Sequence, residues 1–442
     1  IVKGDGSLIN TNIAKLKPVE TIMSGPAAAT IGASWLTNIK NAVVSDIGGT
    51  TTDISLINFG TPNVNHEGSV IGGWKTMVEA LDIQTTGLGG DSEVSVNLNK
   101  NNNSVINIGP SRAVPLSQLA CDYSQVINDL KTQLNNPLTN YTFGKFVWLK
   151  SSINKPSWLR PIESKIWDKL NNQFPIALSD LAPNQSILGA INRLIKYNLL
   201  GYSAFTPTDA NHILNKYSKL NIEAAFLGAK ILIKNKDIYG NFIAKDITEL
   251  SKIIFQTMII KTSESIFEYV LNKEKEFPNV NSIDKNPILK NILSGKRGNV
   301  SEISLKINIP LIALGASAKT YYNLVTRKLS TNLIIPKNYE VAGAVGAAIG
   351  SIKQTVKILI SSSERDVFIV HNLRVIKKFS NLSKAKNYSI INAKKNVRKR
   401  CIDAGAKKVK VTCKDLDKFV EMGNKEKLFI ESVVIASGIG SV

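Results

Sequence analysis

The segment at residues 46–53, Asp-Ile-Gly-Gly-Thr-Thr-Thr-Asp, constrains the fold more than any other part of this chain. The apolar run that leads into it, residues 42–47, predicts a buried strand. Residues 53–57 predict a second strand, and the glycines between the two runs predict a tight turn. We therefore expect a strand–turn–strand hairpin with one aspartate, Asp46 or Asp53, on each side of the turn.

This turn has the composition of a phosphate-binding loop. Successive backbone N–H groups of residues 48–51 can surround phosphate oxygens, because glycine permits conformations that point several donors the same way. A carboxylate at the end of the first strand, here Asp46, can hold Mg²⁺ through water, since Mg²⁺ keeps much of its hydration shell. The alternative for this segment, taken alone, is a plain hairpin with a glycine turn.

A second glycine turn occurs more than 260 residues further along the chain. Residues 309–314 predict a strand, residues 315–318 (Gly-Ala-Ser-Ala) a tight turn, and residues 319–329 a helix. Such a backbone can lie flat against an adenosine, and the helix N-terminus favours anions. We expect the two turns to face each other across one cleft, because one nucleotide must reach both. Taken alone, the second turn is that of an ordinary strand–helix connection.

Helix-capping residues and the spacing of apolar side chains predict the other helices and strands. Helices are expected at residues 24–35, from 207, at 222–232, at 246–272 and at 342–352, with a short strand at 333–335. The last segment reads as strand, helix, strand, strand, at residues 368–370, 383–404, 409–413 and 428–436. This order predicts a small α+β domain that begins near residue 366.

Composition excludes several classes of protein. Hydrophobic residues make up 43% and charged residues 20% of the 442, as in an ordinary globular chain. No apolar stretch reaches the roughly 18–20 residues that a membrane span needs, so no membrane partner is expected. Three cysteines and three histidines in no close cluster argue against a disulfide framework and a Cys- or His-built metal centre, and fit a cytoplasmic location. The chain begins at Ile1 without a signal-peptide pattern, which predicts a fragment or a processed chain.

The net charge of +21, from 55 basic and 34 acidic residues, raises nucleic acid as a partner. The charge is uneven, since residues 353–442 hold 20 basic against 8 acidic side chains. The lysines there lack the interleaved aromatic side chains typical of nucleic-acid binding. We therefore interpret the charge as a solvated basic surface and expect no specific nucleic-acid binding.

Several further short segments stand in a characteristic order: Gly4-Asp5-Gly6-Ser7, residues 18–27, Gly72-Gly73-Trp74, Gly87-Leu88-Gly89-Gly90-Asp91-Ser92, Ile108-Gly109-Pro110-Ser111 and Phe205-Thr206-Pro207-Thr208-Asp209-Ala210. With the two glycine turns, this series resembles the hydantoinase/oxoprolinase family, in the actin/sugar-kinase/heat-shock-chaperone ATPase superfamily. The resemblance covers nearly the whole chain. Such an ordered series is far more specific than any single string.

The resemblance implies roles for single residues. Asp46, Gly48, Gly49, Thr50 and Thr51 resemble the family's second phosphate loop, with Asp46 as the metal-binding carboxylate and Asp53 as the second carboxylate. Gly315, Ala316 and Ser317 resemble its adenosine turn. Asp91 lies in a segment similar to a glycine-rich one near the active cleft, and we expect it to be catalytic together with Asp46 and Asp53. The alternative for Asp91 is an aspartate that caps a turn.

The fold that the resemblance implies is α/β. It has an actin/sugar-kinase-like (ribonuclease H-like) nucleotide-binding core, a helical insertion and a small C-terminal α+β domain. We expect the first part of the core, with the phosphate loop, at residues 1–120 and a Trp- and Pro-rich helical insertion at 121–205. A helical segment and the second part of the core, with the adenosine turn, should occupy 206–365, and the small basic domain 366–442.

The activity that the resemblance implies is the ATP- and Mg²⁺-dependent opening of a small cyclic amide, such as a hydantoin or 5-oxoproline. Two alternatives stay open: a subunit of an ATP-dependent ketone carboxylase, and a non-catalytic ATP-binding subunit or degraded remnant. Family members carry a further N-terminal domain with its own Asp-x-Gly-Gly-Thr loop, whereas this chain has a single such motif. We therefore expect an N-terminal half or a second hydantoinase subunit as partner, and slow or no turnover by this chain alone.

Overall fold

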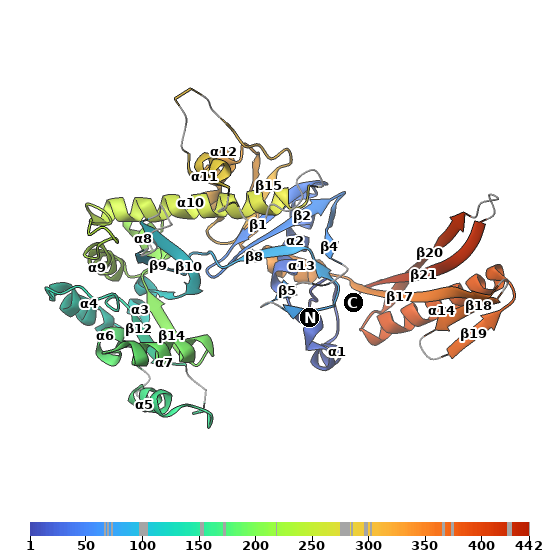
Figure 1. Cartoon of the computed structure of the whole chain (residues 1–442), viewed down its shortest axis with the longest axis horizontal. Helices are drawn as coiled ribbons and strands as arrows, with labels where there is room; N and C mark the ends of the chain where they lie inside the picture. Colours follow the sequence, from blue (N-terminus) through green and yellow to red (C-terminus); the bar gives the residue numbers. More distant parts are fainter. Residues whose placement is uncertain are drawn as a thin grey trace. The chain divides into compact units, whose positions relative to one another are not determined.

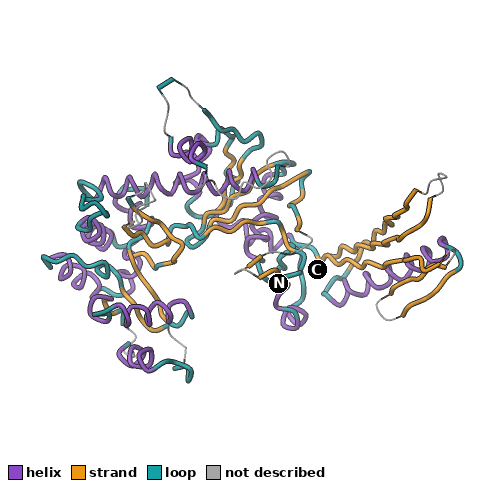
Figure 2. The backbone as a smooth tube through the Cα atoms, viewed as in Figure 1, coloured by secondary structure: helices purple, strands orange, loops and turns teal. Residues whose placement is uncertain are grey.

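A computed structural model of the chain gives the fold (Figures 1 and 2). It describes all residues except 66, 67, 69, 72, 73, 97–104, 151–153, 171–173, 218, 275–282, 284, 285, 296–298, 301, 302, 365, 366, 373, 374, 422–426 and 442. Gly72 and Gly73 of the motif series therefore lie outside the described residues. The chain divides into two compact units, each discontinuous in sequence: unit 1 comprises residues 1–40, 55–83 and 341–442, and unit 2 comprises 41–54 and 84–340.

Unit 2 contains the parallel strands of a mixed sheet, and both glycine turns follow these strands. Strand β1 (Ala42–Ile47) pairs in parallel with β15 (Leu311–Leu314), which pairs in parallel with β16 (Leu333–Ile334). Both β1 and β15 are nearly continuous apolar runs, as expected for strands buried on both faces of a sheet. Strand β2 (Thr52–Asn58) begins directly after the turn that follows β1. The strands predicted around the two turns are confirmed.

Two helices complete the core of this sheet. Helix α12 (Ala318–Lys328) follows β15 and packs on it, and α10 (Ile247–Leu271) packs on α12. Phe255 of α10 stacks on Tyr321 of α12 with ring centroids 5.2 Å apart. The side chain of Asp246 caps α10, which confirms the predicted helix start.

The remainder of unit 2 consists of helices and two small sheets. Strands β9 and β10 form an antiparallel pair, and a further sheet has the order β11-β14-β12-β13. The predicted helices from 207 and at 222–232 are confirmed as α8 and α9. The bounds are β8 (Ile83–Thr86, at the unit boundary), β9 (Ser92–Val96), β10 (Ile106–Arg112), β11 (Val114–Pro115), α3 (Leu116–Asp122), α4 (Gln125–Asn135), β12 (Phe146–Leu149), α5 (Pro161–Lys169), β13 (Ile176–Ala177), α6 (Leu178–Leu181), α7 (Gln185–Lys196), β14 (Leu200–Ala204), α8 (Pro207–Ile213), α9 (Ile222–Ile233) and α11 (Pro287–Ser294).

In unit 1, helix α2 (Ser24–Thr37) packs against α13 (Ala342–Ile349) at very short range. Glycines make this approach possible. A methyl group built onto Gly32 would lie 2.0 Å from a backbone oxygen of α13, and one on Gly346 would lie 1.9 Å from the carbonyl oxygen of Ala28. The small residues of the two helices therefore permit close backbone packing.

The last part of unit 1 is an antiparallel sheet with the order β19-β18-β17-β21-β20 and one helix, α14, along a face (Figure 1). The predicted small α+β arrangement is present, but the expected strand–helix–strand–strand order was wrong because it omitted β17 and β19. The helix predicted to reach residue 352 ends at 349, since the chain becomes extended at Ile352. The bounds are β17 (Ile352–Glu364), β18 (Val367–Asn372), β19 (Val375–Phe379), α14 (Leu382–Asp403), β20 (Lys408–Glu421) and β21 (Lys427–Ser441).

The first residues of the chain are tied to its last third within unit 1. The Leu8 amide donates to the Ser351 carbonyl (2.9 Å), and the Asn10 amide donates to the Ala404 carbonyl (3.1 Å). The remaining elements of this unit are short: α1 (Thr11–Leu16), a 3-10 helix (Pro18–Thr21), β3 (Thr61–Pro62), β4 (Val64–Asn65), β5 (Val70–Ile71), β6 (Trp74–Lys75) and β7 (Ala80–Leu81). The expected division into four consecutive ranges stays a prediction.

Among the described residues, no helix is both long and apolar enough to cross a membrane.

Candidate functional site

The two glycine turns lie side by side at the carboxyl ends of β1 and β15. Asp46 is opposite Leu314 in the parallel register, so both strands end at the same edge of the sheet. Gly315 has a φ of +88°, and a methyl group built onto it would lie 2.3 Å from the Ile47 carbonyl oxygen and 2.6 Å from Asp46 Oδ1. Only glycine fits at this position. The turns that were expected to face each other are therefore direct neighbours.

The turn after β1 leaves backbone donors unused. The Gly48 amide donates to the Thr51 carbonyl at 2.9 Å, which closes the turn. Within the described part of the chain, the amides of Gly49 and Thr50 have no acceptor, and Gly49 is exposed. Successive unpaired amides in a glycine turn form a concave donor surface that suits an anion.

A third glycine-rich segment packs on this turn and brings Asp91 to it. The amides of Gly90 and Asp91 donate to the carbonyls of Gly48 (3.1 Å) and Gly49 (2.6 Å). A methyl group built onto Gly49 would lie 2.5 Å from Asp91 Oδ2, and one on Gly89 would lie 2.4 Å from the Gly49 oxygen. The Asp91 carboxylate therefore lies against the tip of the turn.

The turn that precedes Asp91 is capped by its neighbour. The Gly89 amide donates to Ser92 Oγ at 2.9 Å, whereas Asp91 Oδ2 lies 3.6 Å from Nη2 of Arg112. Burial raises the pKa of Asp91, and the guanidinium of Arg112 acts in the opposite direction. Because Ser92 caps the turn, the half-buried Asp91 carboxylate is available to a ligand.

Asp46 and Asp53 form a pair of partly buried carboxyl groups. Burial, together with the negative charge of Asp53, raises the pKa of Asp46 to about 6. Burial also raises the pKa of Asp53, whose two oxygens accept hydrogen bonds from Thr85 Oγ1 (2.6 Å) and Thr51 Oγ1 (3.4 Å). The charge of Asp53 disfavours the ionised form of Asp46, so a cation bound beside them would be stabilising.

This donor set fits a hydrated cation rather than a protein-enclosed one. In the described ranges, no group of three or more His, Cys, Asp or Glu side chains could hold a metal. Mg²⁺ needs no such cage, because it is usually held by one or two carboxylates together with phosphate and water oxygens. Asp46 and Asp53, next to the unused amides of the turn, meet that requirement.

Helix α8 holds the glycine-rich segment in place, a role that was not predicted. Thr208 donates both its amide and its hydroxyl to the Gly90 carbonyl, each at 2.9 Å. Asp209, fully buried, accepts hydrogen bonds from the amide and hydroxyl of Thr206 and from the first two amides of α3. The sequence predicted this helix start, but no local pattern links Thr208 to a carbonyl 118 residues away.

All the predicted site residues lie in unit 2. Ser317 also approaches the glycine-rich segment, since a methyl group built onto Gly90 would lie 3.9 Å from Ser317 Oγ. Ala316 is exposed. The structure thus gathers the turns at 48–51 and 315–317 and the segment at 89–91 around one edge of the sheet.

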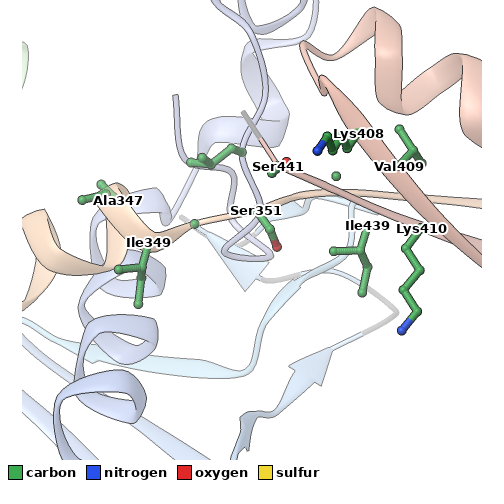
Figure 3. A pocket seen from close by; sticks show the side chains of 12 residues that line it. Ala347, Ile349, Ser351, Lys408, Val409, Lys410, Ile439 and Ser441 are labelled. Atoms are coloured by element: carbon green, nitrogen blue, oxygen red, sulfur yellow. The ribbon is translucent and has the colours of Figure 1, made fainter.

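One cavity lies beside these features, and another lies in unit 1. The first, of about 800 Å³, is lined by residues 84 and 86–88, which lead into the glycine-rich segment, by the first part of β10 and by polar side chains of α10, including Lys261 and Glu264. The other, of about 990 Å³, lies in unit 1 between the end of α13, Leu8 and the paired ends of β20 and β21 (Figure 3). No predicted site residue lines the second cavity.

Comparisons with known proteins identify a family and a fold. The sequence profile described as hydantoinase/oxoprolinase matches residues 1–229. A search of curated proteins found no match. The structure is similar to nucleotide-free acetone carboxylase, an enzyme of ATP-dependent acetone carboxylation, with a TM-score of 0.54 and 13% identity over 100% of this chain and 52% of that one.

It also aligns with the ATP-dependent caprolactamase from Pseudomonas jessenii, with a TM-score of 0.47 and 14% identity over 99% of this chain and 52% of that one. The chain therefore spans about half the length of each of these structures. With acetone carboxylase it shares a mixed α/β fold.

Proposed function

The chain belongs to the hydantoinase/oxoprolinase family, and we propose that its unit 2 binds Mg²⁺-ATP for the activation of a small amide or carbonyl substrate. One observation carries this proposal: the Asp46 carboxyl, the donor-rich turn after β1 and the glycine turn after β15 lie together at one edge of the sheet. A ligand that combines phosphates with a flat base is the kind that needs both turns.

Each part of the nucleotide has a candidate partner. The unused amides of Gly49 and Thr50 would receive phosphate oxygens, and residues 315–317 would lie against the adenosine. Asp46, with Asp53 beside it, would hold Mg²⁺ through its water shell. When bound, Mg²⁺ supplies charge neutralisation for the phosphates. Asp91, at the tip of the turn, would face the reacting end of the nucleotide.

We infer that the core is of the actin/sugar-kinase type. Support comes from the strand–glycine turn–strand after β1, the strand–glycine turn–helix after β15, and the fold shared with acetone carboxylase. In such a core the protein contributes mainly position and preorganised charge to phosphoryl transfer. ATP would phosphorylate the amide or carbonyl oxygen of the substrate and so make a better leaving group before water attacks.

For the substrate we propose a cyclic amide, such as a hydantoin or 5-oxoproline, on the strength of the family. The cavity of about 800 Å³ beside residues 84–88 is our candidate for its binding place, because those residues lead directly to Asp91. The fold shared with acetone carboxylase keeps a ketone carboxylase subunit as the second candidate. A non-catalytic ATP-binding subunit or a degraded remnant is the third.

We propose further that turnover requires a second polypeptide with its own phosphate loop. The chain spans only about half of the acetone carboxylase chain, and it has a single Asp-x-Gly-Gly-Thr loop. Loss of one preorganised set of donors costs on the order of 10²–10³ in rate. The partner would be an N-terminal half or a second hydantoinase subunit.

The test is a titration of the chain with Mg²⁺-ATP, followed by turnover assays. We expect Mg²⁺-dependent binding that weakens at least about 10-fold in Asp46→Asn, and no change in the matched control Asp168→Asn, whose carboxyl is 64% exposed on α5. Absence of Mg²⁺-ATP binding, or equal binding by Asp46→Asn, would contradict the nucleotide site.

Turnover would then separate the candidate reactions. With the second polypeptide added, ATP hydrolysis stimulated by hydantoin or 5-oxoproline supports the amide reaction, and stimulation by acetone with bicarbonate supports the carboxylase. Binding without any stimulated turnover supports a non-catalytic subunit. Robust turnover by residues 1–442 alone would contradict the requirement for a partner.

A further inference from the structure

Arg112 is a cationic side chain at the candidate site that no motif identified. It is the last residue of β10, where it pairs with Ser92, directly after Asp91. The next amide, that of Ala113, donates to the Asp91 carbonyl at 2.8 Å. Two backbone connections therefore hold the start of the Arg112 side chain beside Asp91.

The strand pairing is irregular just before this side chain. The register shifts between the pairs Ile108–Val94 and Arg112–Ser92, so β10 has two more residues than β9 in this stretch. Irregular pairing of this kind is common beside active sites. Here the guanidinium ends 3.6 Å from Asp91 Oδ2, the same oxygen that lies against Gly49 at the tip of the turn.

The Asp91 ion pair leaves most of the guanidinium available. An arginine has five N–H donors in a planar fork, whereas a separation of 3.6 Å from one carboxylate oxygen is an ion pair without a short hydrogen bond. The Arg112 side chain is 62% exposed. It can therefore turn its remaining donors toward an anion at the turn without losing Asp91.

The carboxyl groups around the turn are the reason why a cation is needed there. Asp46, Asp53 and Asp91 place three carboxyl groups at the turn. A polyphosphate would meet these carboxylates as it approached the turn. Because an arginine fork matches two phosphate oxygens at once, it is the side chain best suited to offset that repulsion.

We propose that Arg112 binds the γ-phosphate of ATP, with Asp91 as the residue that positions its guanidinium. This inference rests on the proposed function, because it requires a nucleotide at the turn. It makes Arg112 the group that distinguishes ATP from ADP in this chain. Both the fork and the charge of the arginine contribute, so lysine replaces it only in part.

The test compares two nucleotides with three variants by calorimetric titration in Mg²⁺. The probes are ADP and a non-hydrolysable ATP analogue, and the variants are Arg112→Gln, Arg112→Lys and the control Arg327→Gln. Arg327 is an exposed arginine in the last turn of α12, at the opposite end of that helix from the turn at 315–317. Thermal unfolding of each variant reports whether the fold is intact.

We expect Arg112→Gln to lose affinity for the ATP analogue by about 10- to 100-fold and for ADP by less than about 3-fold. Arg112→Lys should fall between wild type and Arg112→Gln, and Arg327→Gln should match wild type with both nucleotides. Equal losses for ADP and the analogue, or no loss for either, would overturn the role of Arg112 and leave the nucleotide site standing. Failure of the wild-type chain to bind either nucleotide would instead overturn the proposed function.

Discussion

At Asp46, the burial that comes with folding opposes the negative charge that a cation site needs. Its carboxyl is partly buried, occupies the space that a side chain at Gly315 would need and lies near the negative charge of Asp53. These surroundings raise its pKa from 3.8 to about 6. Between these pH values, Asp46 is therefore protonated in the folded chain and ionised in the unfolded chain. A cation at the site would reverse this penalty, which is the expected property of a metal-binding carboxylate.

A pH-dependent stability difference should follow from Asp46. Because the folded-state pKa is raised, the penalty for the ionised form grows as the pH rises from about 4 through about 6. The free energy of unfolding of Asp46→Asn relative to wild type should therefore increase by roughly 1 kcal/mol between pH 5 and pH 7.5. Urea unfolding in metal-free buffer at the two pH values measures it.

The control for this prediction is Asp168→Asn, which removes a carboxyl that is 64% exposed. Its difference from wild type at the two pH values is the reference against which Asp46→Asn is compared. An Asp46→Asn variant that became relatively less stable at the higher pH would show that the Asp46 carboxylate is stabilised by partners rather than penalised.

Gly315 provides a second prediction at the scale of the residue. In Gly315→Ala the new methyl group would meet the Ile47 carbonyl at 2.3 Å in a backbone conformation with φ +88°, so the turn must move away from β1. We expect a loss of about 2 kcal/mol or more in unfolding free energy, measured by chemical denaturation, and weaker Mg²⁺-ATP binding.

The matched control is Gly189→Ala, in the open surface of helix α7, where a methyl group meets nothing within 4 Å. It should stabilise the chain by about 0.5–1 kcal/mol, because alanine is the better helix former. If both substitutions had the same effect, the contact between the turn after β15 and the end of β1 would not be as close as described.

At the scale of the element, the pair of α2 and α13 shows how small residues determine packing. The two helices approach so closely that backbone atoms of one occupy the space that side chains of the other would need. Runs of alanine and glycine in both helices signal this in the sequence. What no helix pattern reveals is that the partner of α13 lies some 300 residues earlier.

Two glycines of α13 should respond oppositely to the same substitution. Gly346→Ala places a methyl group 1.9 Å from the Ala28 carbonyl oxygen and should cost about 2–3 kcal/mol, because the helices must separate. Gly343→Ala, where nothing lies within 4 Å, should stabilise the chain by about 0.5–1 kcal/mol. Thermal or urea unfolding of both variants is the measurement. A destabilised Gly343→Ala together with a neutral Gly346→Ala would contradict the packing of these helices.

Strand β17 illustrates why one element escaped the sequence-based prediction. Its buried residues Ile352, Val356, Ile358 and Ile360 alternate with more exposed ones in the spacing of a strand. The apolar alanine–glycine run just before it extends to the same isoleucine, so the helical pattern and the strand pattern share a residue. Pairing with β21 over ten successive residues decides in favour of the strand.

At the scale of the whole molecule, neither unit is a continuous stretch of chain. Unit 1 joins residues 1–40 to residues 341–442, through α2 and α13 and through the hydrogen bonds of Leu8 and Asn10. Cooperative local unfolding follows contacts rather than sequence proximity. The two ends of the chain should therefore unfold together.

Hydrogen–deuterium exchange at increasing urea concentration tests this prediction. Peptides from residues 24–37 and 342–349 should lose protection at the same urea concentration, and peptides from β1, β15 and α12 at a different one. In Gly346→Ala, protection should fall in α2 and α13 and stay unchanged in unit 2. Exchange of residues 24–37 in step with unit 2 would contradict the division into units.

The sequence alone determined the strand–turn–strand at 42–58, the strand–turn–helix at 311–328 and the identity of their glycines and carboxylates. These follow from local physical chemistry: apolar periodicity, the conformational freedom of glycine and the capping of helix ends. The tertiary structure alone decided which of these features meet. Packing between distant segments sets the register of β1 on β15 and the contact of Asp91 with Gly49. It also sets the hydrogen bonds from Thr208 to Gly90 and the position of Arg112 beside Asp91. No local pattern encodes such packing, because its energy exists only once the segments are together.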